Sequence, residues 1–331
     1  MALLKPWLYL PVSWAHPLGH IYLKIYGKLK SPKVKKWRSL IWKDLVFPNP
    51  LGIAGGVDKS GDSIQGWWSC GAGFLEVGTV TPLPQNPNPG KILARDIKNL
   101  AVWNRLGFPS LGMEHTFKTL ANIKKPWPTP VLINVGKNRS TPNHEAHNDY
   151  LAVMNHLNSL ADVFVINISS PNTIGLRDLQ SEDALKQLLD KTLQAYRQKN
   201  AGFSRPILLK LSPDLNQIEL EAALNISLEF EIDGWILSNT TLSRYSDCPF
   251  PTEGGVSGKP LAKLSLNSLK LALNFLGSKR TGKLLISVGG ISSHEDIEER
   301  LALGANLVQV YSALIYNGPG FFSDMSKASS P

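Results

Sequence analysis

From residue 44 onward, short apolar stretches alternate with longer helical or loop stretches. The short stretches are apolar on both faces, which is typical of parallel strands covered by helices. This pattern predicts strands at 51–54, 74–80, 131–135, 163–168, 207–211, 234–237, 284–288 and 307–310. Between them it predicts helices, among others at 184–199, 217–228, 265–276 and 294–303.

Eight strand-then-helix units in about 290 residues fit a (β/α)8 barrel better than an open sheet. The predicted fold class is therefore α/β, a TIM barrel over residues 44–331 that contains the active site, without internal repeats. In such barrels the carboxyl ends of the strands carry the chemistry. Nearly every predicted strand ends in Gly, Asn, Lys, Ser or Thr, so we predict a site at that end of the barrel.

Residues 1–43 form a different segment, with nine Lys and Arg, no Asp or Glu, and four of the nine tryptophans. The remaining residues hold 26 basic and 26 acidic groups, so the net charge of +9 belongs to this segment. Apolar residues at helical spacing predict two short amphipathic helices, one before Pro11 and one after Pro17. The segment fits a membrane-surface anchor and a helical hairpin packed on the barrel equally well. So much apolar surface disfavours a nucleic-acid-binding arm.

The composition is that of a soluble globular protein, with 43% hydrophobic and 18% charged residues. Two cysteines, Cys70 and Cys248, are too few for a disulfide framework and indicate a reducing compartment. The sequence has no apolar run near the roughly 18 residues of a membrane span, and no signal-peptide pattern.

Two short sequences resemble known site motifs but lack a required feature. Residues 56–63 are similar to a phosphate-binding P-loop, except that Asp62 stands where the lysine belongs. His144 and His147 are three residues apart, whereas the zinc motif HExxH spaces its histidines by four. No metal site is predicted.

The remaining strand ends suit a phosphorylated, planar, polar ligand. Gly289 and Gly290 after the seventh strand, with Tyr311 and Ser312 after the eighth, lie where such barrels bind a phosphate. Asparagine amides match the alternating N–H and C=O edge of a flavin or a pyrimidine. Five of them lie at strand ends or in nearby loops: Asn104, Asn134, Asn167, Asn172 and Asn239.

Two lysines, Lys59 and Lys210, also lie at strand ends, where an unpaired ammonium would be costly to bury. A cation at Lys210 would stabilise negative charge on a reduced flavin ring. The alternative for Lys210 is an ion pair with an acidic neighbour such as Asp214.

Longer motifs span the chain: NPLGIAGGVDKSG, EVGTVTP, NRLGF, INVGKN, NISSPNTIGLR, SNTTL, GGVSGKPL, VGGI and LVQVYSALIY. Together they resemble the class 2, quinone-dependent dihydroorotate dehydrogenase family over nearly the whole chain. The resemblance implies one FMN per chain. The residues at the family's FMN positions are Ala54, Gly55, Gly56, Val57, Asp58, Thr79, Asn134, Asn167, Lys210, Ser238, Gly258, Gly289, Gly290, Tyr311 and Ser312.

The same resemblance implies oxidation of dihydroorotate to orotate in pyrimidine biosynthesis. Ser170 has the position of the catalytic base, where class 1 enzymes carry cysteine, and would take the C5 proton while hydride leaves C6 for FMN. Lys59 would pair with the substrate carboxylate. The residues at the family's substrate positions are Lys59, Asn104, Arg105, Leu106, Gly107, Phe108, Asn167, Asn172, Asn239 and Thr240.

The resemblance further implies that a membrane quinone accepts the electrons, near His16, Arg95 and Tyr311. In this family two N-terminal helices lie on the membrane and frame the quinone tunnel, which favours the membrane alternative for residues 1–43. Without a targeting peptide, we expect a monomeric, peripheral protein on the inner face of the cytoplasmic membrane.

The sequence departs from the family pattern in three places. Residues 90–95 lack the usual Pro-Arg, Ser238 replaces a more usual threonine, and 244–253, the expected active-site flap, matches no family motif. Two other functions are compatible with these residues. One is a related FMN barrel oxidoreductase with a soluble acceptor, and the other is a non-catalytic barrel that binds a phosphorylated ligand.

Overall fold

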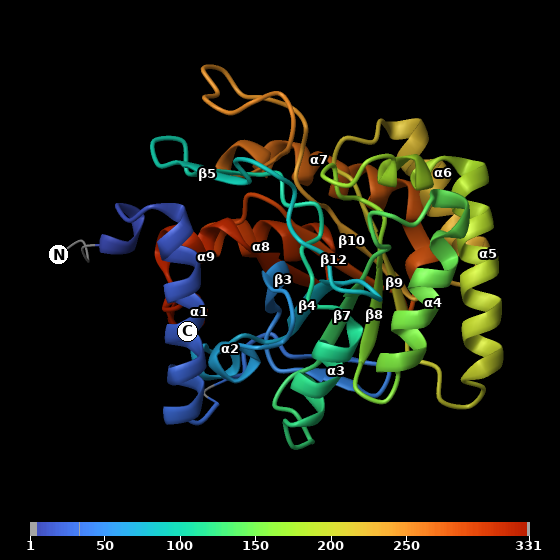
Figure 1. Ribbon diagram of the computed structural model, residues 1–331, viewed down its shortest axis with the longest axis horizontal. Helices are drawn as coiled ribbons and strands as arrows, with labels where there is room; N and C mark the ends of the chain where they lie inside the picture. The colour runs from blue at the N-terminus through green and yellow to red at the C-terminus, as the bar shows by residue number, and fades with distance from the viewer. Residues whose placement is uncertain (1–4, 33, 330–331) are drawn as a thin grey trace.

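The computed structural model describes residues 5–32 and 34–329, with the backbone alone at residues 13 and 16 (Figure 1). Eight parallel strands in chain order form a closed barrel in which the last strand pairs with the first. They are β3 (Leu51–Asp58), β4 (Leu75–Val80), β7 (Val131–Val135), β8 (Val163–Asn167), β9 (Ile207–Leu211), β10 (Gly234–Leu237), β12 (Leu284–Val288) and β13 (Leu307–Val310). All eight predicted strands are confirmed, although β3 continues beyond residue 54 to Asp58.

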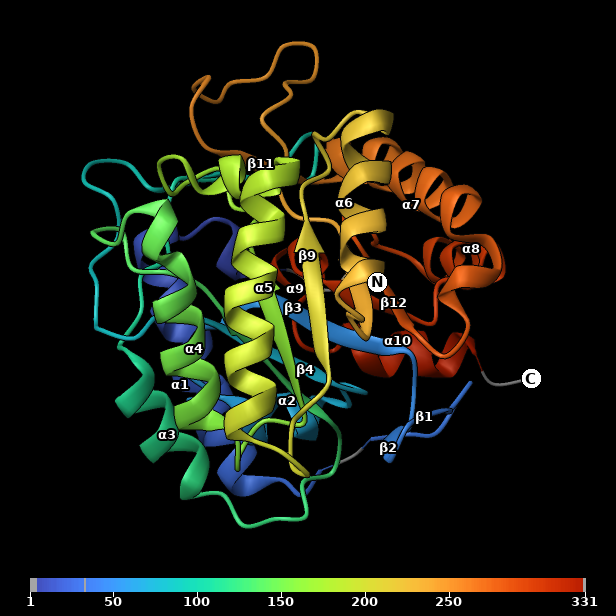
Figure 2. The same ribbon diagram turned by 90° about the vertical axis from the view of Figure 1, so that its right-hand side faces the viewer.

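Helices surround the barrel and cover its outer face (Figure 2). They include α2 (Ile64–Cys70), α3 (Met113–Ala121), α4 (Ala146–Leu157), α5 (Glu182–Lys199), α6 (Gln217–Glu229), α7 (Ala262–Leu276), α8 (His294–Leu303), α9 (Ser312–Asn317) and α10 (Phe321–Ala328). The four helices predicted above are α5 to α8. Capping boxes begin α6 at Asn216 and α8 at Ser293, as the sequence pattern of a helix start requires.

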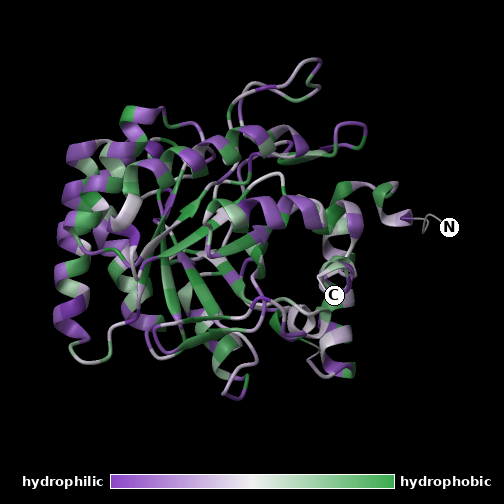
Figure 3. Cartoon of the chain, turned by 180° about the vertical axis from the view of Figure 1, so that it is seen from behind, coloured by the Kyte–Doolittle hydropathy of each residue, from purple (hydrophilic) through white to green (hydrophobic). Residues whose placement is uncertain are grey.

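The core has two layers, because successive strand residues face opposite sides of the sheet. On β9, Leu208 lies inside the barrel and Leu209 lies outside, between the sheet and the helices. Figure 3 shows the strands as mostly hydrophobic, while the surrounding helices alternate between hydrophobic and hydrophilic residues. This two-sided burial explains why the strands lack a polar face in the sequence.

Two small sheets that the sequence analysis missed close the ends of the barrel. The hairpin of β1 (Leu40–Trp42) and β2 (Leu45–Phe47) covers the amino end, where Phe47 packs edge-on against Phe74. The boundary predicted after residue 43 lies in the turn of this hairpin. At the carboxyl end, β5 (Leu93–Asp96), β6 (Ala101–Asn104) and β11 (Gly255–Gly258) form a three-stranded sheet.

The N-terminal segment differs from its prediction. One helix, α1 (Val12–Leu29), runs through Pro17, so the prediction of a helix that starts only after Pro17 is wrong. Proline removes one backbone donor, but residues on both sides of it, such as Val12 and Leu23, pack toward the barrel and hold the helix together. Of the first predicted helix, residues 1–4 lie outside the described part, and a short 3-10 turn, η1 (Pro6–Leu8), is present.

Two glycines set the distance between α1 and α2. A Cβ atom on Gly27 would lie 2.4 Å from the backbone nitrogen of Gly66, and one on Gly66 would lie 2.3 Å from the carbonyl oxygen of Leu23. Real Cβ atoms do not approach backbone atoms so closely. The contact between the two helices therefore requires glycine at both positions.

We expect Gly66→Ala to push α1 away from the barrel and to lower the free energy of unfolding by about 1–3 kcal/mol, as overpacked contacts do. Urea unfolding and limited proteolysis within α1 would measure both effects. Gly19→Ala is the matched control in α1, because a Cβ there meets no atom within 4 Å and alanine favours helix. Equal stability and equal cleavage of the two variants would contradict the close contact.

Candidate active site

A cavity of about 1000 Å³ opens at the carboxyl ends of the strands. Most of the residues predicted for cofactor and substrate line it, together with Ser170. These are Ala54, Gly55, Gly56, Lys59, Thr79, Asn104, Leu106, Gly107, Phe108, Asn134, Asn167, Asn172, Lys210, Ser238, Asn239, Thr240, Gly258, Gly289, Gly290, Tyr311 and Ser312. The parallel strands thus bring residues more than 250 positions apart to one rim.

Three predicted residues lie beside the cavity instead of lining it. The carboxylate of Asp58 is buried and accepts a hydrogen bond from the backbone N–H of Ser63 at 2.8 Å. Burial raises the pKa of Asp58 to about 6, although hydrogen bonds from backbone N–H groups, that of Ser63 first, act to lower it. Val57 faces a second cavity described below. The guanidinium of Arg105 lies 3.0 Å from the carboxylate of Glu253, a residue of the loop that follows β10.

A continuous row of hydrogen bonds joins the predicted amide residues. The hydroxyl of Thr79 donates to Oδ1 of Asn134 at 2.7 Å, and Nδ2 of Asn167 donates to that same oxygen at 3.1 Å. The hydroxyl of Ser169 donates to Oδ1 of Asn167 at 2.8 Å, and Nδ2 of Asn239 donates to the Ser169 hydroxyl at 2.9 Å. The row connects β4, β7 and β8 with the loop after β10.

A second amide pair faces the cavity from the opposite side. Nδ2 of Asn172 donates to Oδ1 of Asn104 at 2.7 Å. The Oδ1 atom of Asn172 and the hydroxyl of Thr240 are buried without a protein partner among the described residues. Both residues line the cavity, so these polar atoms are suited to bind a ligand.

Lys210 makes a buried ion pair, but its partner is not the one suggested above. Its ammonium group lies 2.9 Å and 3.0 Å from the two carboxylate oxygens of Glu76 on β4. Asp214 is instead bound by Arg177 at 2.7 Å. Glu76 was missed, although a charged residue inside an apolar strand is itself a signal. Gln309 on β13 is a second case: its amide is fully buried in the cavity wall, and neither polar atom has a partner in the described part of the chain.

Lys59 is the other cation of the cavity. Its ammonium group donates to the backbone oxygen of Gly56 at 3.2 Å. Burial lowers its pKa, partly offset by the charge of nearby Asp58. Among the described residues, no carboxylate lies within 4 Å of this ammonium group. An anionic ligand would restore the lost solvation.

The turns after β12 and β13 bring backbone to the wall of the cavity at Gly289, Gly290, Tyr311 and Ser312. Gly289 and Gly290 have φ values of 122° and 73°, and a Cβ on Gly290 would lie 2.4 Å from Cα of Ala262. The buried guanidinium of Arg300 donates to the carbonyl of Gly289 at 3.2 Å and to the hydroxyl of Ser287 at 3.0 Å. The turns after strands seven and eight are where barrels of this kind commonly bind a phosphate.

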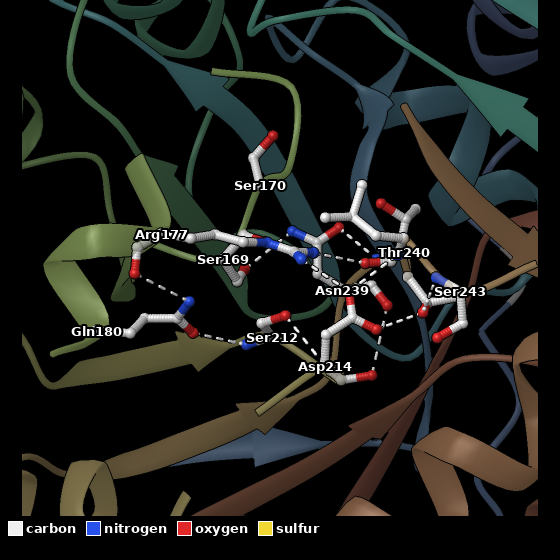
Figure 4. A network of polar contacts seen from close by, with 12 residues as sticks. Ser169, Ser170, Arg177, Gln180, Ser212, Asp214, Asn239, Thr240 and Ser243 are labelled. Atoms are coloured by element: carbon white, nitrogen blue, oxygen red, sulfur yellow. Dashed lines mark hydrogen bonds and ion pairs between the residues drawn. The ribbon is translucent and has the colours of Figure 1, made fainter. Parts of the chain in front are cut away.

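Ser170 is buried in the loop after β8, and its Oγ atom accepts a hydrogen bond from the backbone N–H of Asn172 at 3.2 Å. Arg177 fixes this loop to the loop after β10 (Figure 4). Its guanidinium donates to the carbonyl of Ser169 at 3.0 Å and to that of Thr240 at 2.9 Å. The Arg177–Asp214 pair was also missed, although Arg177 lies within the motif NISSPNTIGLR.

Comparison with known proteins agrees with this geometry. The family model described as dihydroorotate dehydrogenase matches residues 40–328. The chain belongs to the dihydroorotate dehydrogenase family. The hairpin β1–β2 and the whole barrel lie within the matched region.

Two relatives are named dihydroorotate dehydrogenase (quinone). The protein from Stenotrophomonas maltophilia is 37% identical, and the alignment covers 99% of this chain and 95% of the relative. That from Thermus thermophilus is 41% identical, with 83% of this chain and 77% of the relative covered. A crystal structure of DHODH from Eimeria tenella in complex with ferulenol superposes with a TM-score of 0.85 at 29% identity, covering 94% of this chain and 89% of the other.

A second cavity, of about 1590 Å³, lies between α1 and the barrel. Its lining is mostly apolar and comes from η1, α1, β5 and α9. Arg95 lies in this lining and donates to the carbonyls of Trp7 and Leu10, so it holds the N-terminal turn in place. His16 belongs to α1, but its side chain lies outside the described part. Tyr311 lines both cavities, and burial raises its pKa to about 12.

His20 is a further titratable residue in the apolar cavity, and the sequence analysis assigned it no role. Its ring nitrogen Nδ1 lies 3.1 Å from the hydroxyl of Ser63. Burial lowers its pKa to about 4, and the charges of Lys59 and Lys24 act in the same direction, against that of Asp62. His20 is therefore neutral at pH 7.

The depressed pKa of His20 predicts a specific pH dependence. The unfolded chain binds a proton near pH 6.5 and the folded chain only near pH 4, so the stability contributed above pH 6.5 is lost as the pH falls toward 4. We expect His20→Gln to lose less stability than the wild type between pH 7.5 and pH 5, by about 1–2 kcal/mol in urea unfolding. His144→Gln is the control, because His144 is exposed. Identical pH slopes in all three proteins would contradict the shift.

Proposed function

We propose that this protein oxidises dihydroorotate to orotate with FMN as its resident cofactor and a quinone as electron acceptor. The observation that carries the proposal is the position of Tyr311 in the walls of two unlike cavities. One cavity is lined by amides, hydroxyls and two lysines, and the other is mostly apolar. A cofactor beside Tyr311 would lie next to a polar substrate on one side and a hydrophobic acceptor on the other.

The lining of the polar cavity fits FMN in its chemistry, because hydroxyls, amides and a lysine meet there beside two pairs of turn residues. The turns at Gly289–Gly290 and Tyr311–Ser312 would bind the phosphate, and Thr79, Asn134 and Asn167 would meet the polar edge of the ring. Ala54 to Gly56, Ser238 and Gly258 would form the walls, with Val57 and Asp58 supporting them. The buried amide of Gln309 is a further candidate contact.

Bound FMN would supply a hydride acceptor and then pass two electrons to quinone. The protein's own residues would hold the substrate flat beside the bound FMN. The Lys59 ammonium would bind the substrate carboxylate, and Asn104, Asn172 and Asn239 would bind its ring N–H and carbonyl groups. The 104–108 segment and Thr240 would close the site around it and exclude water.

Ser170 would take the proton from C5 of the substrate at its Oγ atom. The backbone N–H of Asn172 donates to this oxygen, which orients the hydroxyl and stabilises the negative charge that develops on it. Because Arg177 ties the loop of Ser170 to that of Thr240, base and substrate-binding groups would keep their spacing during the reaction.

The apolar cavity would receive the quinone, beside Tyr311, Arg95 and His16. No helix in the described ranges is long and apolar enough to cross a membrane. Support for a peripheral position comes from α1, which exposes Trp14, Ile21, Ile25 and Leu29. Such a face, with basic residues nearby, suits a membrane surface. We propose that residues 1–43 lie on the inner face of the cytoplasmic membrane and that the protein is a monomer.

The function is tested by the absorbance spectrum of the purified protein, before and after dihydroorotate is added without oxygen. We expect flavin bands that bleach on addition. Flavin bands that persist would indicate a related oxidoreductase with another substrate. No flavin, even after incubation with FMN, would indicate a binding barrel without redox chemistry.

Ser170→Ala should retain FMN and lose about 10²–10⁴-fold of the rate of flavin reduction by dihydroorotate, the usual contribution of a positioned base. Stopped-flow absorbance would measure this rate. Ser243→Ala is a comparison in the loop after β10, and it should stay near the wild-type rate. A Ser170→Ala variant that reduces its flavin at the wild-type rate would remove Ser170 from the proposed role.

Membrane binding is tested by co-sedimentation with anionic liposomes. We expect Ile25→Asp to weaken binding on the order of tenfold, because it removes apolar contact and adds a like charge at the surface. Ile218→Asp is the matched control, since Ile218 is exposed on α6. Equal binding of both variants and the wild type would contradict a membrane role for α1.

A further inference from the structure

Glu76 is a fully buried carboxylate in the middle of the barrel, and neither the chemistry proposed above nor the sequence motifs gave it a role. Its two oxygens accept hydrogen bonds from the ammonium group of Lys210 at 2.9 Å and 3.0 Å. Oε1 also accepts a hydrogen bond from Nδ2 of Asn134. Gly55 leaves room for it, because a Cβ there would lie 2.6 Å from the same oxygen.

A carboxylate can only accept hydrogen bonds, and this property fixes the orientation of its neighbour. Asn134 must turn its NH₂ group toward Glu76, so its oxygen faces Thr79 and Asn167. Asn167 presents its NH₂ group to that oxygen, and its own oxygen accepts from both the hydroxyl and the backbone N–H of Ser169. An amide can otherwise be rotated by 180° at little cost in shape.

The same order continues to the mouth of the cavity. Because the Ser169 hydroxyl donates to Asn167, its oxygen is left to accept from Nδ2 of Asn239. Oδ1 of Asn239 accepts from the backbone N–H of Thr240 at 2.7 Å. The acceptor-only carboxylate of Glu76 at one end of the row and the backbone N–H groups of Ser169 and Thr240 further along it impose the same set of directions.

We propose that Glu76 is a positioning residue that sets the donor and acceptor direction of Asn134, at the start of the row that runs to Asn239. The proposal rests on the proposed function, because that row faces the flavin and the dihydroorotate. A flat ligand with alternating N–H and C=O groups is bound only if every amide presents the correct side. Glu76 thereby selects the ligand without touching it.

A simpler role for Glu76, that of filling space, makes a different prediction. If it only fills space, the isosteric glutamine would replace it well and the shorter aspartate would leave a gap. If Glu76 instead sets the hydrogen-bond direction of Asn134, glutamine would not replace it. Lys210 attracts the glutamine oxygen, the glutamine NH₂ then faces Asn134, and Asn134 must rotate against Thr79 and Asn167. Aspartate keeps the acceptor-only carboxylate.

The experiment compares Glu76→Gln and Glu76→Asp in the full-length, FMN-loaded protein. Orotate is titrated into the oxidised enzyme and followed by the flavin absorbance change, which requires no turnover. We expect Glu76→Gln to raise the Kd of orotate by about tenfold to a hundredfold, the effect of one or two mismatched buried hydrogen bonds. Glu76→Asp should stay within about threefold of the wild type.

Glu229→Gln is the charge-matched control, since Glu229 is not buried and lies at the end of α6, and it should not change the Kd. A wild-type Kd in Glu76→Gln, or weaker binding by Glu76→Asp than by Glu76→Gln, would overturn the proposal. If Glu76→Gln retains no FMN, Glu76→Asp decides: orotate binding within about threefold supports the proposal, and loss of binding overturns it. A wild type that binds no orotate would instead contradict the proposed function.

Discussion

Closure of the parallel sheet by the pairing of β13 with β3 is the constraint on which both cavities depend. It brings Ala54, near the start of the barrel, and Tyr311, near its end, to the same rim. It also creates an interior without solvent, in which a charged residue needs a partner. The Lys210–Glu76 pair meets that need with three hydrogen bonds to one carboxylate, including the one from Asn134.

In many proteins a buried ion pair adds little net stability, because removing two charges from water offsets their attraction. The value of the Lys210–Glu76 pair lies in the order it gives to the polar groups around it. The amide row that begins at Asn134 reaches the loops after β8 and β10, and Arg177 holds those two loops together. Hydrogen bonds thus order the base of the site, and Arg177 connects the two loops at its mouth. That geometry suits the removal of a proton from a small planar substrate.

The second cavity depends on one helix. Helix α1 packs against α2 at Gly27 and Gly66, and the guanidinium of Arg95 donates to carbonyls of the segment that precedes α1. The apolar space beneath α1 is separated from the polar site by Tyr311, a side chain belonging to the end of β13. A polar cavity and an apolar cavity thus meet at one side chain.

The sequence by itself predicted the eight strands, four of the helices and most of the residues that line the polar cavity. The strands followed from their burial on both faces, and many of the cavity residues followed from the resemblance to the dihydroorotate dehydrogenase family. The sequence did not give the partner of Lys210, since Glu76 is 134 positions away and only the closed barrel brings the two together. It also placed a helix boundary at Pro17, which the packing of α1 overrides. Local pattern specifies which residues are buried, whereas long-range contacts decide which buried polar groups meet.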